Sequence, residues 1–338
     1  MEVLALTRKL VDIESTTGNE AAVGACVLQL LQKLASQYGG IAEQIEVAPE
    51  RFNVLARFGE PAITLSTHLD TVPPFIPLHE DETHIWGRGA CDAKGIAAAM
   101  ICAAKSLLAG GVRDFALLFV VGEEKDSAGA YHAGRHPMGS RYLINGEPTG
   151  NRLALGSKGA LRYELAASGR MAHSAYPELG ESAIEKLLDA LARVRRIPLP
   201  RDATLGPCTL NIGLISGGRA PNVIPDAALA ALMFRLVGDP DPIRAAVERA
   251  AAPDAVANEL LCIPALRLGA LPGFETTVVS YTTDIPAFGG QWGEPFLIGP
   301  GSIHVAHTGE ERVPKAELLE AVQVYARLVR QLLAGGAK

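Results

Sequence analysis

Apolar runs of strand length recur through the first half of the chain, and polar side chains follow directly where these runs end. The clearest run spans residues 115–121 and is followed by Gly122, Glu123 and Glu124. A strand that is apolar on both faces is typical of a parallel sheet covered by helices. Helical patterns alternate with these runs, so we predict an α/β fold with a mostly parallel sheet. In such folds, ligands bind at the carboxyl ends of the strands.

The predicted elements divide the chain into two parts. Helices are expected at 4–13, 19–37 and 93–108, and strands at 41–47, 53–58, 63–67, 115–121 and 142–145. From about residue 157 the order becomes strand, helix, strand, strand, helix, strand, which is typical of a ferredoxin-like module. A final helix at 315–334 returns to the first part. We therefore predict a discontinuous domain, 1–157 and 267–338, with an inserted domain at 158–266.

His68, Asp70 and Asp92 lie at predicted ends of elements. His68 and Asp70 follow the strand at 63–67 and are two residues apart, so they point to the same side of an extended chain. If His68 binds a metal ion, Asp70 can accept the other ring N–H. Asp92 precedes a predicted helix, where a carboxylate is an ordinary N-terminal cap. A solvated strand end and a simple cap remain alternatives for these residues.

Further carboxylates and histidines repeat this placement. The adjacent Glu123 and Glu124 end a buried strand, where divided roles, one binding a cation and one moving protons, fit better than solvation. Glu147 follows the next strand, and His304 and His307 lie near the C-terminal end. Histidines and carboxylates gathered in this way indicate a two-metal hydrolytic site.

Eight motifs occur in one order along almost the whole chain: STHLDTVP, GRGACDAKG, VGEE, NGEPT, MAHSAYP, APNVIPD, TTD and GPGSIHVAH. In this order they resemble the co-catalytic zinc amidohydrolases and peptidases. This family includes acetylornithine deacetylase, succinyl-diaminopimelate desuccinylase, aminoacylase and bacterial glutamate carboxypeptidase. The segments STHLDTVPPF, NGEPT and GPGSIHVAH look most similar to acetylornithine deacetylase. The resemblance implies a zinc-peptidase-like catalytic domain with an inserted dimerisation or lid domain.

The resemblance also implies a set of metal ligands. His68 and Glu147 would hold one ion, Glu124 and His307 the other, and Asp92 would bridge both. The implied cofactors are two divalent ions, with Zn²⁺ expected and Co²⁺ as a substitute. The peptide bond after the bridging aspartate would be cis.

Catalytic and substrate-binding roles follow from the same resemblance. Glu123 would be the general base, and Asp70 would orient His68. His173 would reach the active site of a partner subunit and stabilise the oxyanion, which implies a homodimer joined through the inserted domains. Asn222 and Arg235 would hold the substrate, the arginine gripping a carboxylate. A solvated side chain for His173 and a surface strand charge for Arg235 are the alternatives.

The expected activity is metal-dependent hydrolysis of the amide bond of an N-acyl amino acid, with Glu123 activating a metal-bridged water. Such a dinuclear zinc amidohydrolase would act in amino-acid metabolism. The alternatives are a carboxypeptidase or dipeptidase, or a succinyl-diaminopimelate desuccinylase, on the same scaffold. A non-enzymatic ligand-binding or assembly protein is a third class, against which the intact Glu123 argues.

Bulk composition agrees with this class of enzyme. The formal net charge of −6 comes without a basic stripe, which argues against nucleic acid and anionic membranes as partners. The five cysteines form no CxxC pair, and their odd number argues against a disulfide framework. The first residues have the pattern of an amphipathic helix, not of a signal peptide, and no apolar run reaches membrane-span length. We therefore predict a cytoplasmic protein.

The chain departs from the family pattern at one place. Relatives carry a helix before the segment that matches VVSYTTD, but here only LGALPGFETT fills that space. Whether Thr282, Thr283 or Asp284 contacts the substrate therefore stays open. The same question stays open for His304, because it lies three residues before His307 and could line the site.

Overall fold

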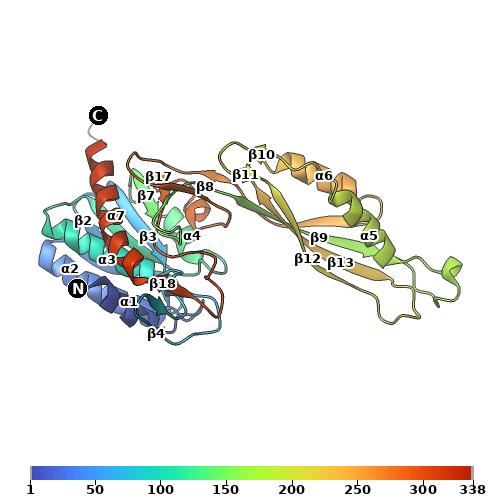
Figure 1. Ribbon diagram of the computed structural model, residues 1–338, viewed down its shortest axis with the longest axis horizontal. Coiled ribbons are helices and arrows are strands. Elements are labelled where there is room, and N and C mark those ends of the chain that lie inside the picture. The colour runs from blue at the N-terminus through green and yellow to red at the C-terminus, as the bar shows by residue number, and fades with distance from the viewer. Residues whose placement is uncertain (1, 336–338) are drawn as a thin grey trace. The chain divides into compact units, whose positions relative to one another are not determined.

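The computed structural model describes residues 2–335. It contains two compact units (Figure 1). Unit 1 comprises Met1–Leu155, Leu268–Thr277 and Thr283–Lys338, and unit 2 comprises Gly156–Arg267 and Val278–Thr282. The α/β fold class predicted from the sequence is confirmed.

Unit 1 is built on a mixed sheet. In the described part of the chain its strand order is β1 (Ile41–Ala48), β2 (Arg51–Phe58), β6 (Phe115–Val120), β3 (Ile63–His68), β7 (Tyr142–Asn145) and β17 (Glu294–Leu297). Strands β6, β3, β7 and β17 are parallel to one another, whereas β2 is antiparallel to both of its neighbours. Every residue of β3 and β6 is buried. The four parallel strands bring their carboxyl ends to one edge of the sheet.

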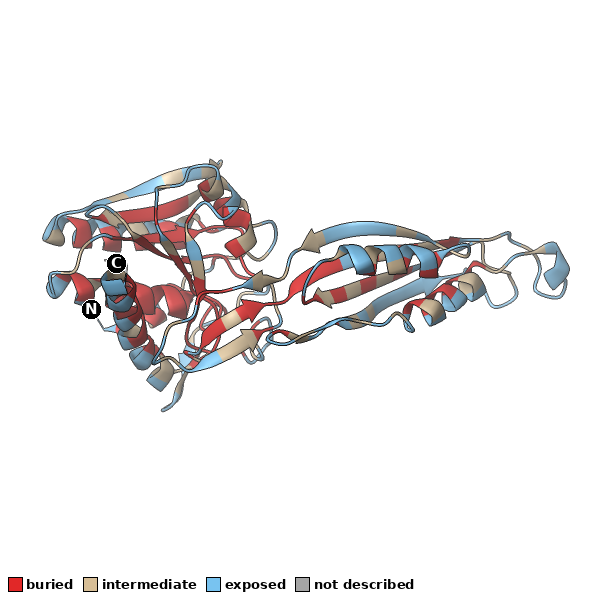
Figure 2. Cartoon of the chain, turned by 90° about the horizontal axis from the view of Figure 1, so that it is seen from above, coloured by how far each residue is buried: buried red, intermediate tan, exposed pale blue. Residues whose placement is uncertain are grey.

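Helices cover both faces of this sheet. On one face lie α1 (Val3–Val11), α2 (Ala21–Tyr38), α3 (Lys94–Ala109) and α7 (Lys315–Gly335). The other face is covered by α4 (Ala128–Gly134) and the 3₁₀ helix η2 (Ile285–Phe288). Helix α3 is buried along most of its length, and buried residues concentrate where helices meet the sheet (Figure 2). Its alanine-rich sequence suits this place, because small side chains let neighbouring helices approach closely.

Unit 2 contains a four-stranded antiparallel sheet in the described residues. Its order is β12 (Thr209–Gly217), β13 (Ala227–Leu236), β9 (Gly159–Ser168) and β14 (Val256–Ile263). Helices α5 (Ala183–Val194) and α6 (Asp241–Ala251) pack on one face of it. Burial alternates along β13, as expected for a sheet covered on one face only. The strand and helix order of a ferredoxin-like module is confirmed.

Shorter elements complete the two units. Strands β8 (Leu153–Ser157), β15 (Leu266–Arg267) and β16 (Thr276–Val279) form a sheet in the order β15-β8-β16 where the chain passes between units. A second small sheet contains β18 (Arg312–Pro314), β5 (His84–Trp86) and β4 (His79–Glu80). The remaining elements are β10 (Arg201–Asp202), β11 (Gly206–Pro207) and η1 (Pro177–Leu179).

The boundaries of the elements predicted in the first half differ from the observed ones by at most two residues. The short elements β4, β5, α4 and β8 were not predicted. Residues 268–275 form no helix, in agreement with the departure seen in the sequence. Within residues 2–335, no helix is both long enough and apolar enough to cross a membrane.

Candidate metal centre

The predicted metal-binding side chains gather at the edge of the unit 1 sheet where its parallel strands end. His68 is the last residue of β3. Glu123 and Glu124 follow β6, which pairs with β3 on one side, and Glu147 follows β7, which pairs with β3 on the other. The order of the strands, not the order of the sequence, therefore makes these side chains neighbours.

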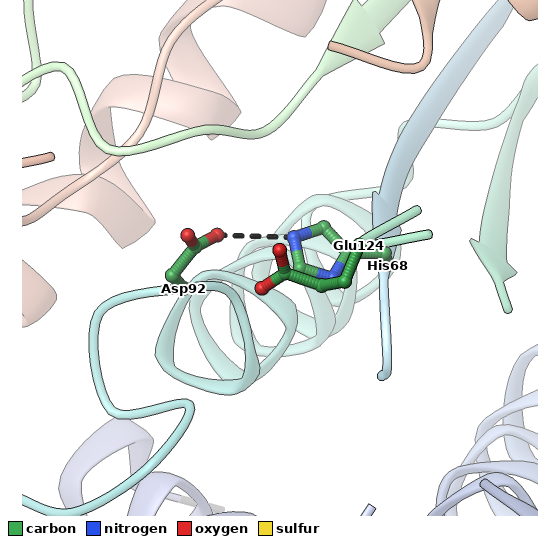
Figure 3. Close-up of side chains that lie close together, drawn as sticks. All are labelled: His68, Asp92 and Glu124. Carbon is green, nitrogen blue, oxygen red and sulfur yellow. Dashed lines mark hydrogen bonds and ion pairs between the residues drawn. The ribbon is translucent and has the colours of Figure 1, made fainter. Parts of the chain in front are cut away.

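Asp92 lies between two imidazole rings. Its Oδ1 is 3.0 Å from His68 Nε2, and its Oδ2 is 3.3 Å from His307 Nε2. His307 Nε2 is also 2.9 Å from Glu124 Oε2. One ligand atom each from His68, Asp92 and Glu124 lies within 4.8 Å of the others (Figure 3). One carboxylate oxygen thus faces each ring, which is the arrangement that a ligand shared between two ions requires.

Glu147 has a buried oxygen without a partner. The residue is 4% exposed, and its Oε1 accepts no hydrogen bond from any described residue. Burial raises the pKa of Glu147 well above its usual range. A buried carboxylate oxygen is costly unless a donor or a cation satisfies it. This orphaned oxygen therefore fits a metal centre.

The electrostatics of the two histidines also suit a cation. Hydrogen bonds with Asp92 and Glu124 raise the pKa of His307 to about 10. Burial opposes protonation of His68, but Asp70 and Asp92 still raise its pKa well above the usual value. An anionic field that favours protonated imidazoles also favours a divalent cation in place of the protons. Imidazole nitrogens and carboxylate oxygens are ligands that Zn²⁺ and related ions accept.

Asp70 contacts its surroundings differently from the prediction. His68 Nδ1 lies 3.0 Å from the backbone oxygen of Asp70, but 3.6 Å from its carboxylate Oδ1. The carboxylate instead accepts hydrogen bonds from the N–H groups of Gly122, Glu123 and Glu124, at 2.9, 3.1 and 3.2 Å. The main chain therefore orients the ring, while the side chain holds the loop that carries the paired glutamates. The physical reason is that β6 ends beside β3 and leaves these N–H groups without strand partners.

Glu123 differs from Glu124 in its contacts. No side-chain hydrogen bond joins Glu123 to another described residue, whereas Glu124 contacts His307. Desolvation by the surrounding protein raises the pKa of Glu123 well above its usual value, and the charge of Asp284 adds to this effect. A carboxylate with a raised pKa beside candidate metal ligands is suited to general base chemistry.

Asp284 is brought close to the centre despite the missing helix. It is 1% exposed, and neither carboxylate oxygen has a hydrogen-bond partner among the described residues. Burial raises its pKa to about 7. His304, by contrast, is exposed, and its ring makes no hydrogen bond to a described residue. The sequence left the role of Asp284 open. In the structure its charge acts on Glu123 and raises the pKa of that carboxylate.

The candidates in unit 2 lie at two ends of its sheet. His173 and Asn222 are exposed neighbours, since the N–H of Ser174 donates to the Asn222 oxygen at 3.0 Å. Nδ1 of His173 accepts the Ala175 N–H at 3.2 Å, so the neutral ring carries its proton on Nε2. Arg235 is half-buried on β13 and has no ion pair among the described residues.

Sequence reasoning missed two residues of the centre, Arg88 and Glu311. Their side chains form a buried ion pair of 2.6 Å beside the loop that carries Asp92. The sequence indicated their role only weakly, because Arg88 lies between two glycines and Glu311 lies directly before a short strand. The cis peptide bond predicted at Asp92–Ala93 is confirmed.

Comparisons with known proteins agree with this geometry. A family model described as peptidase family M20/M25/M40 matches residues 64–331. An Aspergillus niger protein named probable carboxypeptidase is 39% identical over 370 residues, covering 96% of this chain and 88% of its own. Aminopeptidase PepT from Bacillus cereus has the same fold, with a TM-score of 0.79, 20% identity and 98% of both chains covered. A Bacillus subtilis protein described as a dinuclear metal-binding peptidase of family M20 has a TM-score of 0.69, 17% identity and 96% of both chains covered.

Fold and site together define a metal-binding hydrolase of the metallopeptidase class. More particularly, the chain belongs to peptidase family M20/M25/M40. The broad family resemblance predicted from the motifs is thereby confirmed. The particular likeness to acetylornithine deacetylase finds no support, since similar proteins are named probable carboxypeptidases.

Proposed function

We propose that this protein is a dinuclear metallo-carboxypeptidase. It would cleave short peptides, dipeptides included, at the peptide bond that precedes the C-terminal residue with its free carboxylate. The observation that carries the proposal is Asp92, whose two carboxylate oxygens face one imidazole each. The names of the similar fungal proteins support a peptidase over a deacylase of N-acyl amino acids.

The residues at the centre divide the work. His68 and Glu147 would hold one ion, Glu124 and His307 the other, and Asp92 both. Two divalent ions are expected, with zinc as the first choice and cobalt as a substitute. When bound, they would lower the pKa of a water molecule and polarise the carbonyl group of the substrate. Glu123 would take the proton from the attacking water and return it to the leaving amine.

Arg235 would bind the substrate carboxylate. Asn222 neighbours His173, so it would be a further substrate contact at the same site as His173. Arg235 is half-buried and forms no ion pair within residues 2–335, so its guanidinium can donate two hydrogen bonds to a carboxylate.

The spacing within unit 2 supports a homodimer. Arg235 pairs with Ala160, at the opposite end of β9 from Ser168, so about 26 Å of strand separates the two ends. His173 lies beyond Ser168. A dipeptide is too short to span this distance, so Arg235 and His173 of one chain cannot serve the same substrate. If Arg235 serves the site of its own chain, His173 would complete the site of a partner subunit.

The purified protein is expected to bind two divalent ions per chain after reconstitution with zinc or cobalt. Elemental analysis measures this number, and a panel of dipeptides, acetyl-ornithine and succinyl-diaminopimelate then measures the substrate preference. Absence of any bound transition metal would overturn the proposal, and a single ion would remove the bridging role of Asp92. Hydrolysis of the acyl amino acids alone would favour the deacylase instead.

Arg235→Lys is expected to raise KM at least tenfold for a dipeptide, but far less for the same dipeptide with an amidated C-terminus. Lysine keeps the charge but loses the two-pronged contact with a carboxylate. Steady-state kinetics on both substrates measures the difference. Arg249→Lys on α6 is the matched control and should change neither KM. Equal effects of Arg235→Lys on both substrates would place the guanidinium away from the carboxylate.

A further inference from the structure

Glu311 holds the loop that carries Asp92. Glu311 is 2% exposed. Its Oε1 accepts hydrogen bonds from the N–H groups of Gly89, Cys91 and Asp92, at 2.9, 3.3 and 3.2 Å. Hydrogen bonds from N–H groups to a carboxylate are stronger than those between neutral groups. One buried side chain thus fixes the backbone of the candidate bridging ligand.

Arg88 connects this loop to two others. Its Nη1 donates to Glu311 Oε2 at 2.6 Å and to the backbone oxygen of Thr308, next to His307, at 3.3 Å. Its Nε donates to the backbone oxygen of Pro74 at 3.2 Å. The guanidinium therefore joins the segment with Asp92, the segment with His307 and the segment that follows β3.

Asp92 and His307 have particular need of such support. Both lie on loops, whereas His68 is the last residue of a central strand. His307 also has a φ of 62°, a left-handed conformation that is uncommon for a residue other than glycine. The surrounding contacts must hold such a residue in place.

A contribution to folding stability does not explain why Arg88 and Glu311 are charged. Burying an ion pair costs desolvation energy, and an apolar pair of similar volume often stabilises a fold equally well or better. Arg88 and Glu311 are both 2% exposed. What an apolar pair could not do is accept three N–H groups on one side and donate to two carbonyl oxygens on the other.

We propose that Glu311, paired with Arg88, is a positioning residue that fixes Asp92 and His307 relative to each other for metal binding. The inference rests on the proposed dinuclear function. Glu311 touches no candidate ligand side chain and acts through the backbone of the loops. Its loss therefore weakens metal binding before it affects any chemical step.

The test is a titration of the metal-free protein with cobalt, followed by the visible absorption of the bound ion. Outer contacts of this kind typically contribute about 10- to 100-fold in metal affinity. Glu311→Ala is expected to lower cobalt affinity within this range, and Glu311→Gln by about tenfold, because its amide NH₂ would face Arg88. The matched control is Glu259→Gln, which alters another Arg–Glu pair, at 2.7 Å from Arg244, that contacts no candidate ligand loop. The control should bind cobalt like the wild type.

A double variant separates positioning from stability. Arg88→Met combined with Glu311→Leu keeps the volume and removes both charges, so the metal-free protein should unfold at or above the wild-type temperature. The cobalt affinity of this double variant should nevertheless be lower than that of the wild type, and the absorption spectrum of the bound cobalt should differ from the wild-type spectrum. Wild-type affinity in this variant would overturn the inference, as would wild-type affinity in Glu311→Ala. If Glu311→Ala does not fold, the glutamine and double variants decide the question. Failure of the wild type itself to bind cobalt would instead overturn the proposed function.

Discussion

Replacing Glu123 by glutamine is expected to lower kcat by several orders of magnitude and to leave the metal content unchanged. General acid–base catalysis typically contributes about 10²- to 10⁴-fold, and here one side chain would serve both proton transfers. Glutamine has nearly the same shape but cannot accept the proton. Glu123 forms no side-chain hydrogen bond with a described residue, so the change should leave the cluster of Asp92, Glu124 and His307 intact.

The adjacent residue supplies the matched control for this experiment. Glu124→Gln makes the same chemical change one position along, in a side chain whose Oε2 is 2.9 Å from His307 Nε2. This variant should lose metal affinity first, and activity should recover in part at high metal concentration. Elemental analysis and steady-state kinetics of both variants measure the contrast. If both variants lose metal alike, or if Glu123→Gln keeps its turnover, the division of labour between the two glutamates is wrong.

His173→Ala is expected to lower kcat by about 10²- to 10³-fold, the usual effect of removing one oxyanion donor. The hydrogen bond that Nδ1 accepts from the Ala175 N–H leaves Nε2 as the donor of the exposed ring. Metal content and the melting temperature should stay at wild-type values, because His173 lies in unit 2, outside the metal cluster. Replacement of His304, which is also exposed, provides the control and should leave kcat nearly unchanged.

Mixing two inactive variants tests whether His173 acts across subunits. Heterodimers of a His173→Ala chain and a Glu123→Gln chain contain one site with both a wild-type Glu123 and a wild-type His173. About a quarter of wild-type activity per chain is therefore expected after complete subunit exchange, by simple counting of sites. Exchanged heterodimers without activity, or a fully active monomer in sedimentation, would contradict the arrangement.

Much of the fold was predictable because its signals are local. The apolar run before Glu123 and the alternating pattern of β13 each report which faces of a strand are buried. The same logic predicted that polar residues at strand ends would meet, since parallel strands end at one edge. His68, Asp92, Glu124 and His307 are indeed in contact. Their roles as metal ligands remain predictions.

The sequence by itself determined the α/β class, the inserted ferredoxin-like order and the strand ends at which the site forms, because hydrophobic periodicity and motif order are written along the chain. Only the tertiary structure decided which partner each polar side chain takes. It turned the Asp70 carboxylate towards the loop of Glu123 and paired Arg88 with Glu311, which lies 223 residues away. Periodicity reports that a side chain faces inward, but the packing of distant loops sets what it meets there.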